Sequence, residues 1–364
     1  MFRSTYISKI NCITPIGDSL TSNWKALVAG KTAISLHQVG RIPAFYTAKF
    51  KDSPGLIASG FTLLESLLLQ VARPLIQGEV LSDRVGIIIS TTKGNIESLH
   101  HGDTGQAGLY TLAATVAKAL GFIQKPILVS HACVSGLLAV TTAKRLIQMQ
   151  QYDAVLVLAG DMVSEFVASG FNAFQAMSAA ACRPFDERRD GVTLGEAVAA
   201  AWVTADPGNA IAEIVGDGAI NDANHISGPS RTGEGLLRSI QSALAEAQLN
   251  STAIDYISAH GTATIFNDEM EAIAFNRLSL QHCPVNSFKG YYGHTLGASG
   301  LLELVLAIQS MRENMLIPSA GFNTQGTSVP LNILQTLRPK ALQYVLKTAS
   351  GFGGSNAAMV VKKI

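Results

Sequence analysis

Short runs of consecutive apolar residues alternate along this chain with stretches whose apolar residues recur about every 3.6 positions. Runs such as AVLVLA at 154–159 are apolar on both faces, so they predict strands covered on both sides. Strands of this kind, separated by helices, are typical of parallel or mixed sheets between helical layers. The alternation therefore predicts an α/β protein.

The same patterns give the expected element positions. Strands are predicted at 84–90, 126–130, 154–159, 197–204, 211–215, 256–259, 345–349 and 358–361. Helices are predicted at 61–75, 112–120, 135–149, 236–247, 268–278 and 296–311. The segment ADPGN at 205–209 separates two stretches with a similar order of elements. This order permits a duplicated fold in which residues 1–205 and 206–364 are two βα halves of one compact unit, but the periodicity alone does not show it.

Composition narrows the function classes. The 364 residues are 48% hydrophobic and 15% charged, which favours a deep core or a large subunit interface. A net charge of +1 argues against a nucleic-acid partner, and helix 296–311 is too short and interrupted to span a membrane. The four cysteines lie far apart without a CxxC pair, so we expect no disulfide framework and no metal site. Reduced thiols and the lack of a signal-peptide pattern predict a cytoplasmic protein.

One cysteine follows the predicted strand at 126–130, in the segment VSHACVSG. Cys133 would lie at a strand-to-helix turn, where the positive end of the helix dipole favours a thiolate by roughly 0.3–1 kcal/mol. Gly136 would leave room for a tight turn or for close packing. Cys133 is thus a candidate nucleophile, although a lone cysteine is more often an inert core residue.

Three further segments carry chemically capable residues. His260 follows the strand at 256–259 in YISAHGTAT, and Lys289 precedes His294 by five positions in VNSFKGYYGHTLGASG. The segment SGFGGSN at 350–356 is a glycine-rich loop whose N–H groups can face an anion, but it lacks a phosphate-loop signature. Each segment alone could be structural. Together they supply a thiol, two imidazoles, a cation and N–H donors, which suits acyl transfer through a thioester.

At these residues the chain resembles the β-ketoacyl-[acyl carrier protein] synthase family of the Cys-His-His type, within the thiolase superfamily. The resemblance covers essentially the whole chain. The motifs that carry it are HACVSG at 131–136, RPFDERRDGVTLGE at 183–196, AHGTAT at 259–264, KGYYGHTLGASG at 289–300 and GFGGSN at 351–356.

The resemblance implies a thiolase-like fold, in which two similar βα halves form a five-layered αβαβα arrangement. It also implies the activity of an acyltransferase that extends fatty acids, polyenes or polyketides. Cys133 would accept an acyl group from an acyl carrier protein, and a malonyl thioester would then lose CO₂ and condense with it. No bound cofactor is implied, because the phosphopantetheine arrives on the carrier.

The resemblance also implies residue roles. Catalysis would fall to Cys133, His260, His294 and Lys289, and the oxyanion would bind the N–H groups of Cys133 and Phe352. Substrate binding would involve Thr262, Thr264, Gly351, Phe352 as gate, and Gly353. Glu303 would support Lys289, and His225 would lie in a loop near the gate. On these roles we expect His294→Ala to spare acylation of Cys133 and to block decarboxylation.

Departures from the family pattern leave alternatives open. The stretch between Ser90 and Pro126 is abbreviated, Ile265 replaces a proline, and Tyr291 and Tyr292 occupy the Lys–His spacer, all of which could reshape the acyl pocket. Such synthases are usually homodimers, but some pair with a sister subunit. The alternatives are therefore a non-catalytic, chain-length-factor-like subunit of a heterodimer, and a hydrolase or acyltransferase that uses cysteine and histidine without condensation.

Overall fold

The computed structural model describes residues 3–51, 57–58, 60–222, 225–226 and 228–364. Within these residues one 11-stranded sheet dominates, with the order β13-β11-β10-β15-β16-β9-β1-β8-β6-β4-β5. Its strands, in chain order, are β1 Tyr6–Ile13, β4 Val85–Ser90, β5 Ile127–Val129, β6 Ala154–Asp161, β8 Ala197–Thr204, β9 Ala212–Asn221, β10 Tyr256–Ser258, β11 Pro284–Asn286, β13 Asn332–Ile333, β15 Tyr344–Gly351 and β16 Ser355–Lys363.

In the described part of the chain, two small sheets accompany the large one. Strands β2 Ser35–Val39, β3 Ile42–Ala48 and β7 Leu194–Gly195 form the first, and β12 Met315–Leu316 and β14 Arg338–Pro339 form the second. The α-helices are α1 Leu20–Val28, α2 Leu63–Ile76, α3 Leu109–Ala119, α4 Ser135–Gln148, α5 Glu165–Ala173, α6 Glu234–Ala247, α7 Ile265–Arg277, α8 Lys289–Tyr292 and α9 Ser299–Glu313. The described residues also contain the 3₁₀ helices η2 Ile96–His101, η3 Ser251–Ala253 and η4 Leu296–Ala298.

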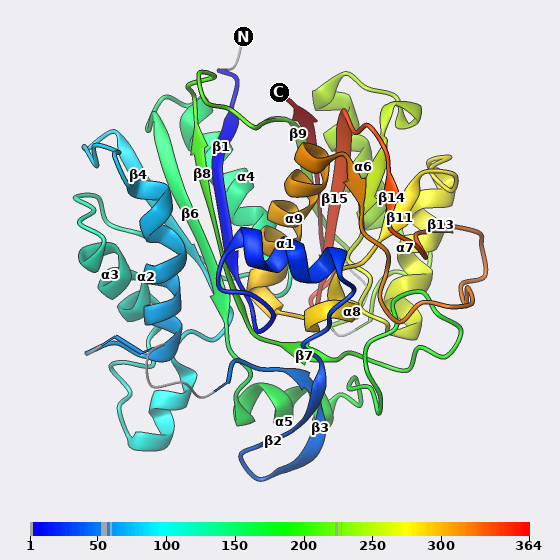
Figure 1. Cartoon of the computed structure of the whole chain (residues 1–364), viewed down its shortest axis with the longest axis horizontal. Helices are drawn as coiled ribbons and strands as arrows, with labels where there is room; N and C mark the ends of the chain where they lie inside the picture. The colour runs from blue at the N-terminus through cyan, green and yellow to red at the C-terminus, as the bar shows by residue number, and fades with distance from the viewer. Residues whose placement is uncertain (1–2, 52–56, 59, 223–224, 227) are drawn as a thin grey trace.

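The elements form the expected five layers (Figure 1). Helix α2 packs on β1, β6 and β8 from outside, and α6 packs on β9 and β16 from the opposite side. Helices α4 and α9 fill the middle layer, where α9 contacts β8 on one face and β15 on the other. The two halves of the sheet are joined where β1 pairs with β9, through Tyr6 with Glu213 and Ile7 with Ala212. The thiolase-like αβαβα arrangement is therefore confirmed, with its two sheets continuous along one edge.

Strand β6 shows why the apolar runs carry no alternation. Val155 and Val157 point into the apolar cluster around α4 and α9, whereas Leu156 and Leu158 point into the cluster under α2 and α3. Successive side chains of a strand face opposite sides, so a strand between two helical layers buries every residue. All eight residues of β6 are buried.

The predicted strands and helices are all present, with shifted ends. Helix 296–311 begins instead as the 3₁₀ turn η4, and α9 starts at Ser299. Strand β1, helix α1 and helix α5 were not expected. β1 was missed because polar residues interrupt its apolar pattern and only three of its eight residues are buried.

A close contact between α4 and α9 sets the position of the site. A Cβ on Gly136 would lie 2.7 Å from Leu301 N, and one on Gly300 would lie 2.6 Å from Leu137 N. Only glycine permits this approach of two helix N-termini. Gly136 therefore serves close packing, and it brings the turn before α4 next to the turn before α9. Within the described residues, no helix is long and apolar enough to cross a bilayer.

Candidate active site

Cys133 is presented by a tight turn between β5 and α4. The preceding residue, Ala132, has φ of 45°, a left-handed conformation that is unfavourable for a residue with a side chain. The Ser135 hydroxyl secures the turn, because it accepts the His131 N–H at 2.6 Å and donates to Ala132 O at 2.6 Å. The Cys133 side chain is thereby directed to the cavity described below, with only 8% of the residue exposed.

His294 is placed by a turn that requires glycine. Gly293 has φ of 68°, and a Cβ there would lie 2.4 Å from Leu194 O. The backbone of His294 pairs with β7 and its flank: its N–H donates to Thr193 O at 2.6 Å, and its carbonyl accepts Gly195 N–H at 3.0 Å. The ring position is thus fixed by the sheet rather than by a free loop.

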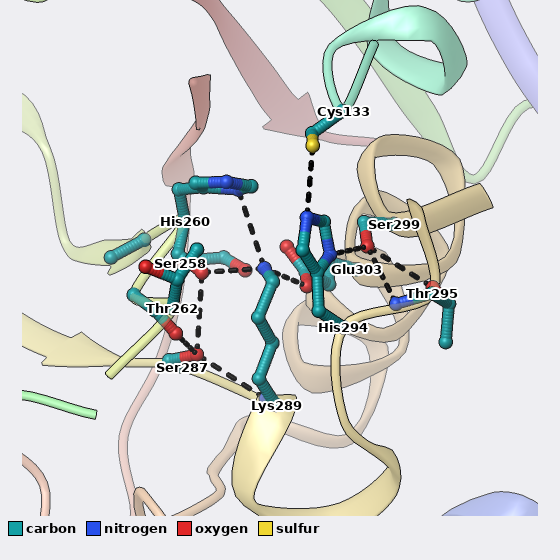
Figure 2. Close-up of polar contacts among 12 residues, drawn as sticks. Cys133, Ser258, His260, Thr262, Ser287, Lys289, His294, Thr295, Ser299 and Glu303 are labelled. Carbon is teal, nitrogen blue, oxygen red and sulfur yellow. Dashed lines mark hydrogen bonds and ion pairs between the residues drawn. The ribbon is translucent and has the colours of Figure 1, made fainter. Parts of the chain in front are cut away.

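The imidazole of His294 joins the thiol to α9. Its Nε2 lies 2.9 Å from the Cys133 sulfur, and its Nδ1 lies 2.8 Å from the Ser299 hydroxyl (Figure 2). A serine hydroxyl can both donate and accept, so it is compatible with a proton on either ring nitrogen of His294. His294 can therefore accept a proton from the thiol or donate one toward the cavity.

His260 lies just beyond the end of β10. Its N–H and that of Gly261 donate to the two oxygens of buried Glu271, at 2.8 and 2.6 Å. The ring stands edge-on to that of His294, with 5.2 Å between centroids and 86° between planes. The two imidazoles are thus close enough to share one substrate oxygen.

A buried ion network lies beneath the two imidazoles. Lys289 Nζ is 2.6 Å from Glu303 Oε1, and Lys347 Nζ is 2.6 Å from Glu303 Oε2. Lys289 also donates to His260 O at 2.5 Å and contacts His260 Nδ1 at 3.3 Å (Figure 2). Because an ammonium group only donates, His260 Nδ1 must accept, and the proton of the neutral ring lies on Nε2.

Both imidazoles are neutral. Burial lowers the pKa of His260 well below its usual 6.5, and the Lys289 charge lowers it further. The pKa of His294 is also lowered well below 6.5, first by burial and then by Lys289. A neutral ring with its proton on Nε2 is a hydrogen-bond donor, so His260 can donate into the cavity.

Burial raises the pKa of the Cys133 thiol to about 11, although Lys289 and a hydrogen bond from the Phe352 N–H act in the opposite direction. The positive helix end expected to favour the thiolate is therefore outweighed by the loss of hydration. The resting group is a thiol. Its proton must leave as the sulfur attacks.

A cavity of about 430 Å³ opens above these groups. The predicted site residues in its wall are Cys133, His260, His294, Thr262, Thr264, Gly351 and Phe352, and His225 joins them. Lys289 and Glu303 lie beneath the imidazoles and outside the cavity wall. Gly353 instead lines a second hollow of about 560 Å³, behind Phe352.

Phe352 separates the two hollows and packs against aromatic residues of the α5 region. Its ring stacks on Phe171 at 5.6 Å and meets the edge of Phe174 at 5.7 Å. Neither partner was predicted. Their contacts hold in place the ring of Phe352, which lines both hollows.

The residues that depart from the family pattern after Lys289 and after Thr264 lie in different parts of the structure. Tyr291 and Tyr292 are buried in the central core and do not line this cavity. Ile265 lies in the cavity wall and is 56% exposed, so its side chain forms part of the cavity surface.

Sequence reasoning missed several residues that position the site. Glu271 holds the turn at His260, Ser299 holds the His294 ring, and Lys347 shares Glu303 with Lys289. Asp161 accepts Gly297 N–H at 2.7 Å and the Thr91 hydroxyl at 2.8 Å, which fixes the turn after His294. Lys347 carried a usable signal, because a lysine within an apolar strand is rarely buried without a partner.

The Cys133 sulfur and one ring nitrogen each of His260 and His294 all lie within 4.8 Å of one another. Sulfur and imidazole nitrogen are ligands that a soft ion such as Zn²⁺ accepts. In chemical terms the arrangement is an attacking thiol beside two neutral donors, which fits a thioester carbonyl equally well.

Comparisons with known proteins agree with this geometry. Residues 79–206 match the family described as "Beta-ketoacyl synthase, N-terminal domain", and residues 211–323 match "Beta-ketoacyl synthase, C-terminal domain". The two matches together cover more than half of the chain.

The names of individual relatives agree with these family matches. A protein of Streptomyces halstedii named as a polyketide β-ketoacyl synthase is 35% identical over 269 residues, covering 69% of this chain but only 64% of that relative. A 3-oxoacyl-[acyl-carrier-protein] synthase 2 of Coxiella burnetii is 28% identical and is matched over 100% of this chain and 99% of its own length. A ketosynthase of Xenorhabdus doucetiae, solved in complex with its chain length factor, superposes with a TM-score of 0.88 at 25% identity, covering 100% of this chain and 98% of that one.

The layered fold and the Cys-His-His site define a condensing acyltransferase. The chain belongs to the β-ketoacyl synthase family. Its activity is the condensation that extends an enzyme-bound acyl chain with a decarboxylated malonyl unit.

Proposed function

We propose that this chain performs both half-reactions itself, with Cys133 as nucleophile and an acyl carrier protein delivering both thioesters on phosphopantetheine. The observation that carries the proposal is the 2.9 Å contact between Cys133 sulfur and His294 Nε2, beside a second neutral imidazole. A thiol alone accounts for acyl transfer. Two imidazoles whose ring centroids lie 5.2 Å apart account for decarboxylation as well.

In the first half-reaction, the Cys133 sulfur attacks the acyl carbonyl while His294 Nε2 accepts the thiol proton. The oxyanion of the tetrahedral intermediate binds the N–H groups of Cys133 and Phe352. In support, the Phe352 N–H already faces the Cys133 sulfur. The carbon–sulfur bond to phosphopantetheine then breaks, and the departing sulfur takes the proton from His294.

Before the second half-reaction, the proton of the neutral His294 ring moves from Nδ1 to Nε2, and the Ser299 hydroxyl, which can donate or accept, is compatible with both tautomers. The malonyl thioester carbonyl then accepts Nε2–H hydrogen bonds from His260 and His294. The bond to the malonyl carboxylate breaks, CO₂ leaves, and the electron pair moves onto the thioester as an enolate. The enolate carbon attacks the acyl-Cys133 carbonyl, the bond from carbon to Cys133 sulfur breaks, and the sulfur takes up one proton from water. Preorganised donors at such an oxyanion contribute about 3–4 kcal/mol each in other enzymes.

Lys289 and Glu303 support this step from below. Lys289 would fix the proton of His260 on Nε2 and Glu303 would hold Lys289 in place, and the contacts of Lys289 with His260 Nδ1 and with Glu303 support both roles. Both side chains are fully buried. We assign them to orientation of His260 and to the local field, without contact with substrate.

The cavity above Cys133 provides the route for the phosphopantetheine arm. Thr262 and Thr264 offer hydroxyl groups 2.9 Å apart in its wall, where an amide of the arm could bind. Gly351 leaves space beside Cys133, since a Cβ there would lie 3.1 Å from Cys133 N. Gly353 and Phe352 would serve the gate between this cavity and the second hollow. No resident cofactor is needed for this chemistry.

We further propose that the active unit is a dimer, with a second copy or a sister subunit. Strand β5 is the edge of the large sheet, and its three apolar residues, Ile127–Val129, are only half-buried. An apolar edge strand of this kind needs a cover. The complex of the Xenorhabdus doucetiae ketosynthase with its chain length factor supports the heterodimeric form, and the mass of the purified species decides between the two.

A non-catalytic partner role is the alternative. It would not require a thiol in contact with an imidazole or a lysine that fixes the second imidazole. The discriminating experiment supplies acyl and malonyl carrier thioesters to the chain purified alone and follows CO₂ and β-ketoacyl product. Product from the chain alone, or with an added sister subunit but lost with Cys133→Ala, supports the proposal. A folded chain whose product formation survives Cys133→Ala contradicts it.

A further inference from the structure

Lys347 is a charged residue in the middle of β15, a strand whose other central residues are buried too. It has no exposed surface. Its ammonium group donates to Glu303 Oε2 at 2.6 Å, to Ser258 O at 3.1 Å and to Ala259 O at 3.2 Å. All three donor positions of Lys347 are therefore directed to the base of the active site.

Lys347 changes the charge of the network under the imidazoles. Lys289 and Glu303 alone would form an ion pair with no net charge. Because Lys347 binds the second oxygen of the same carboxylate, two cations share one anion. Burial lowers the pKa of Lys347, and the Glu303 carboxylate acts in the opposite direction. With both lysines protonated, the group of three carries one net positive charge, in surroundings where charge is weakly screened.

Lys347 also fixes the backbone that carries His260. The carbonyls of Ser258 and Ala259 accept from Lys347, and the next carbonyl, that of His260, accepts from Lys289. Three successive carbonyls are thus held by two ammonium groups. On the other side of this turn, Glu271 accepts the N–H groups of His260 and Gly261.

The two imidazoles are surrounded by a mixed set of titratable groups. Among the described residues, the groups that contact the imidazoles or their network are Lys289 on α8, Glu303 on α9, Lys347 on β15, Glu271 and Asp268 on α7, Asp161 on β6 and Cys133 before α4. Cys182, Tyr256 and Tyr292, whose pKa values are raised first by burial, also interact with the charge of Glu303. Burial lowers the pKa of both imidazoles first, and the charge of Lys347 acts on both in the same direction. Lys347 itself contacts neither ring.

We propose that Lys347 is a positioning residue that keeps both imidazoles neutral and holds His260 in place, so that decarboxylation depends on it while acylation of Cys133 does not. This inference rests on the proposed function. The net positive charge beneath the rings stabilises the negative charge of the enolate. Acylation is less sensitive, because the sulfur contacts His294, which the β7 pairing and Ser299 hold independently.

If the role of Lys347 were purely structural, its substitution would have a different effect on activity and stability. If Lys347 only neutralised Glu303, its loss would reduce stability without altering how activity depends on pH. If it acts on the imidazoles, its loss removes a nearby positive charge and raises their pKa values. The acid limb of decarboxylation, where the imidazoles become protonated, would then move to higher pH.

The test compares Lys347→Met and Lys347→Gln, which are neutral, with Lys347→Arg, which keeps the charge. Lys144→Met is the matched control, because Lys144 is also 1% exposed and paired at 2.7 Å with Asp217 and Glu246, away from the site. Each variant is assayed for acylation by intact-protein mass and for CO₂ release from pH 5 to 9.

We expect the neutral variants to lose about tenfold or more in decarboxylation, with acylation within about threefold of the unsubstituted chain and the acid limb moved to higher pH. Lys347→Arg should recover part of the rate, and Lys144→Met should leave the pH profile unchanged. A neutral variant with an unchanged pH profile, or an equal shift in Lys144→Met, overturns the proposal.

A second measurement keeps the proposal testable if the neutral variants do not fold. The imidazole signals of His260 and His294 in the unsubstituted chain can be titrated by NMR. We expect them to stay neutral well below pH 6.5, and titration near 6.5 overturns the inference. This readout needs no turnover, so it separates failure of the inference from failure of the proposed synthase activity, which would appear as an unsubstituted chain without product.

Discussion

His294 Nε2 lies 2.9 Å from the sulfur of Cys133, although the two residues are 161 positions apart in the sequence. The contact arises because Gly136 and Gly300 let the N-termini of α4 and α9 approach closely, each helix being preceded by one of the two residues. A helix pair in the middle layer thus assembles a nucleophile from one half of the chain with a base from the other.

Replacement of Cys133 by alanine removes the attacking atom. We expect Cys133→Ala to abolish acylation, a loss of at least about a thousandfold, while the far-ultraviolet circular dichroism stays unchanged. Cys182→Ala is the control, because Cys182 is also buried and burial raises its pKa to about 12. An acyl adduct that persists in Cys133→Ala and disappears in Cys182→Ala would show that Cys182 is the nucleophile, which would contradict the assignment of Cys133.

Substitution of His260 and substitution of His294 should affect acylation and decarboxylation differently. From the sequence we expected His294→Ala to spare acylation, but its contact with the sulfur now predicts that this variant slows acylation and decarboxylation alike. The hydrogen bond to the thiol comes from His294 and not from His260, so His260→Ala should keep acylation within a few fold and lose about a hundredfold in decarboxylation. Rapid-quench acylation and CO₂ release measure the two steps. Equal effects of both variants on acylation would contradict the assignment.

The thiol should be poorly ionised at neutral pH. Burial raises the pKa of Cys133 to about 11, so the thiolate fraction increases about tenfold per pH unit below that value. Alkylation by iodoacetamide, followed by intact-protein mass, should therefore accelerate from pH 7 to above pH 10 without a plateau. Cys133→Ala corrects for reaction elsewhere. A plateau near pH 7 would instead show a thiolate–imidazolium pair in the resting protein.

The helix contact behind the site should be sensitive to a single methyl group. In Gly136→Ala the new Cβ would lie 2.7 Å from Leu301 N and 2.8 Å from Gly297 O, so we expect a loss of about 1–3 kcal/mol in unfolding free energy. Gly170→Ala in α5 is the matched control, since nothing lies within 4 Å and alanine favours a helix. Urea denaturation compares the two. Equal stability would show that the α4–α9 approach does not require glycine.

The layered fold could be predicted because apolar runs without alternation arise only where both faces of a strand are covered, as in β6. The same logic failed for β1, whose mixed burial hides its period. Cys133, His260 and His294 could be identified because each follows a strand or a glycine turn within a distinctive motif. The shapes of the loops could not be predicted in this way.

The residues that position the site were harder to foresee. Glu271 and Ser299 act through contacts that depend on how α7 and α9 pack, and no local pattern specifies those contacts. The partition between thiol and thiolate also depends on burial, which the helix-end argument for Cys133 did not include. Lys347 was visible as a charge within an apolar strand, but its partner Glu303 lies 44 positions away.

The most direct measurement of the central claim is a single-turnover experiment on the purified chain, with any sister subunit it requires. Acyl carrier thioester is added first and malonyl carrier thioester second, and intact-protein mass is recorded throughout. The account predicts an acyl adduct on Cys133 that forms first and disappears as CO₂ and β-ketoacyl product appear in equal amounts. An adduct that decays only by hydrolysis to free acid, without CO₂ or product, would contradict it.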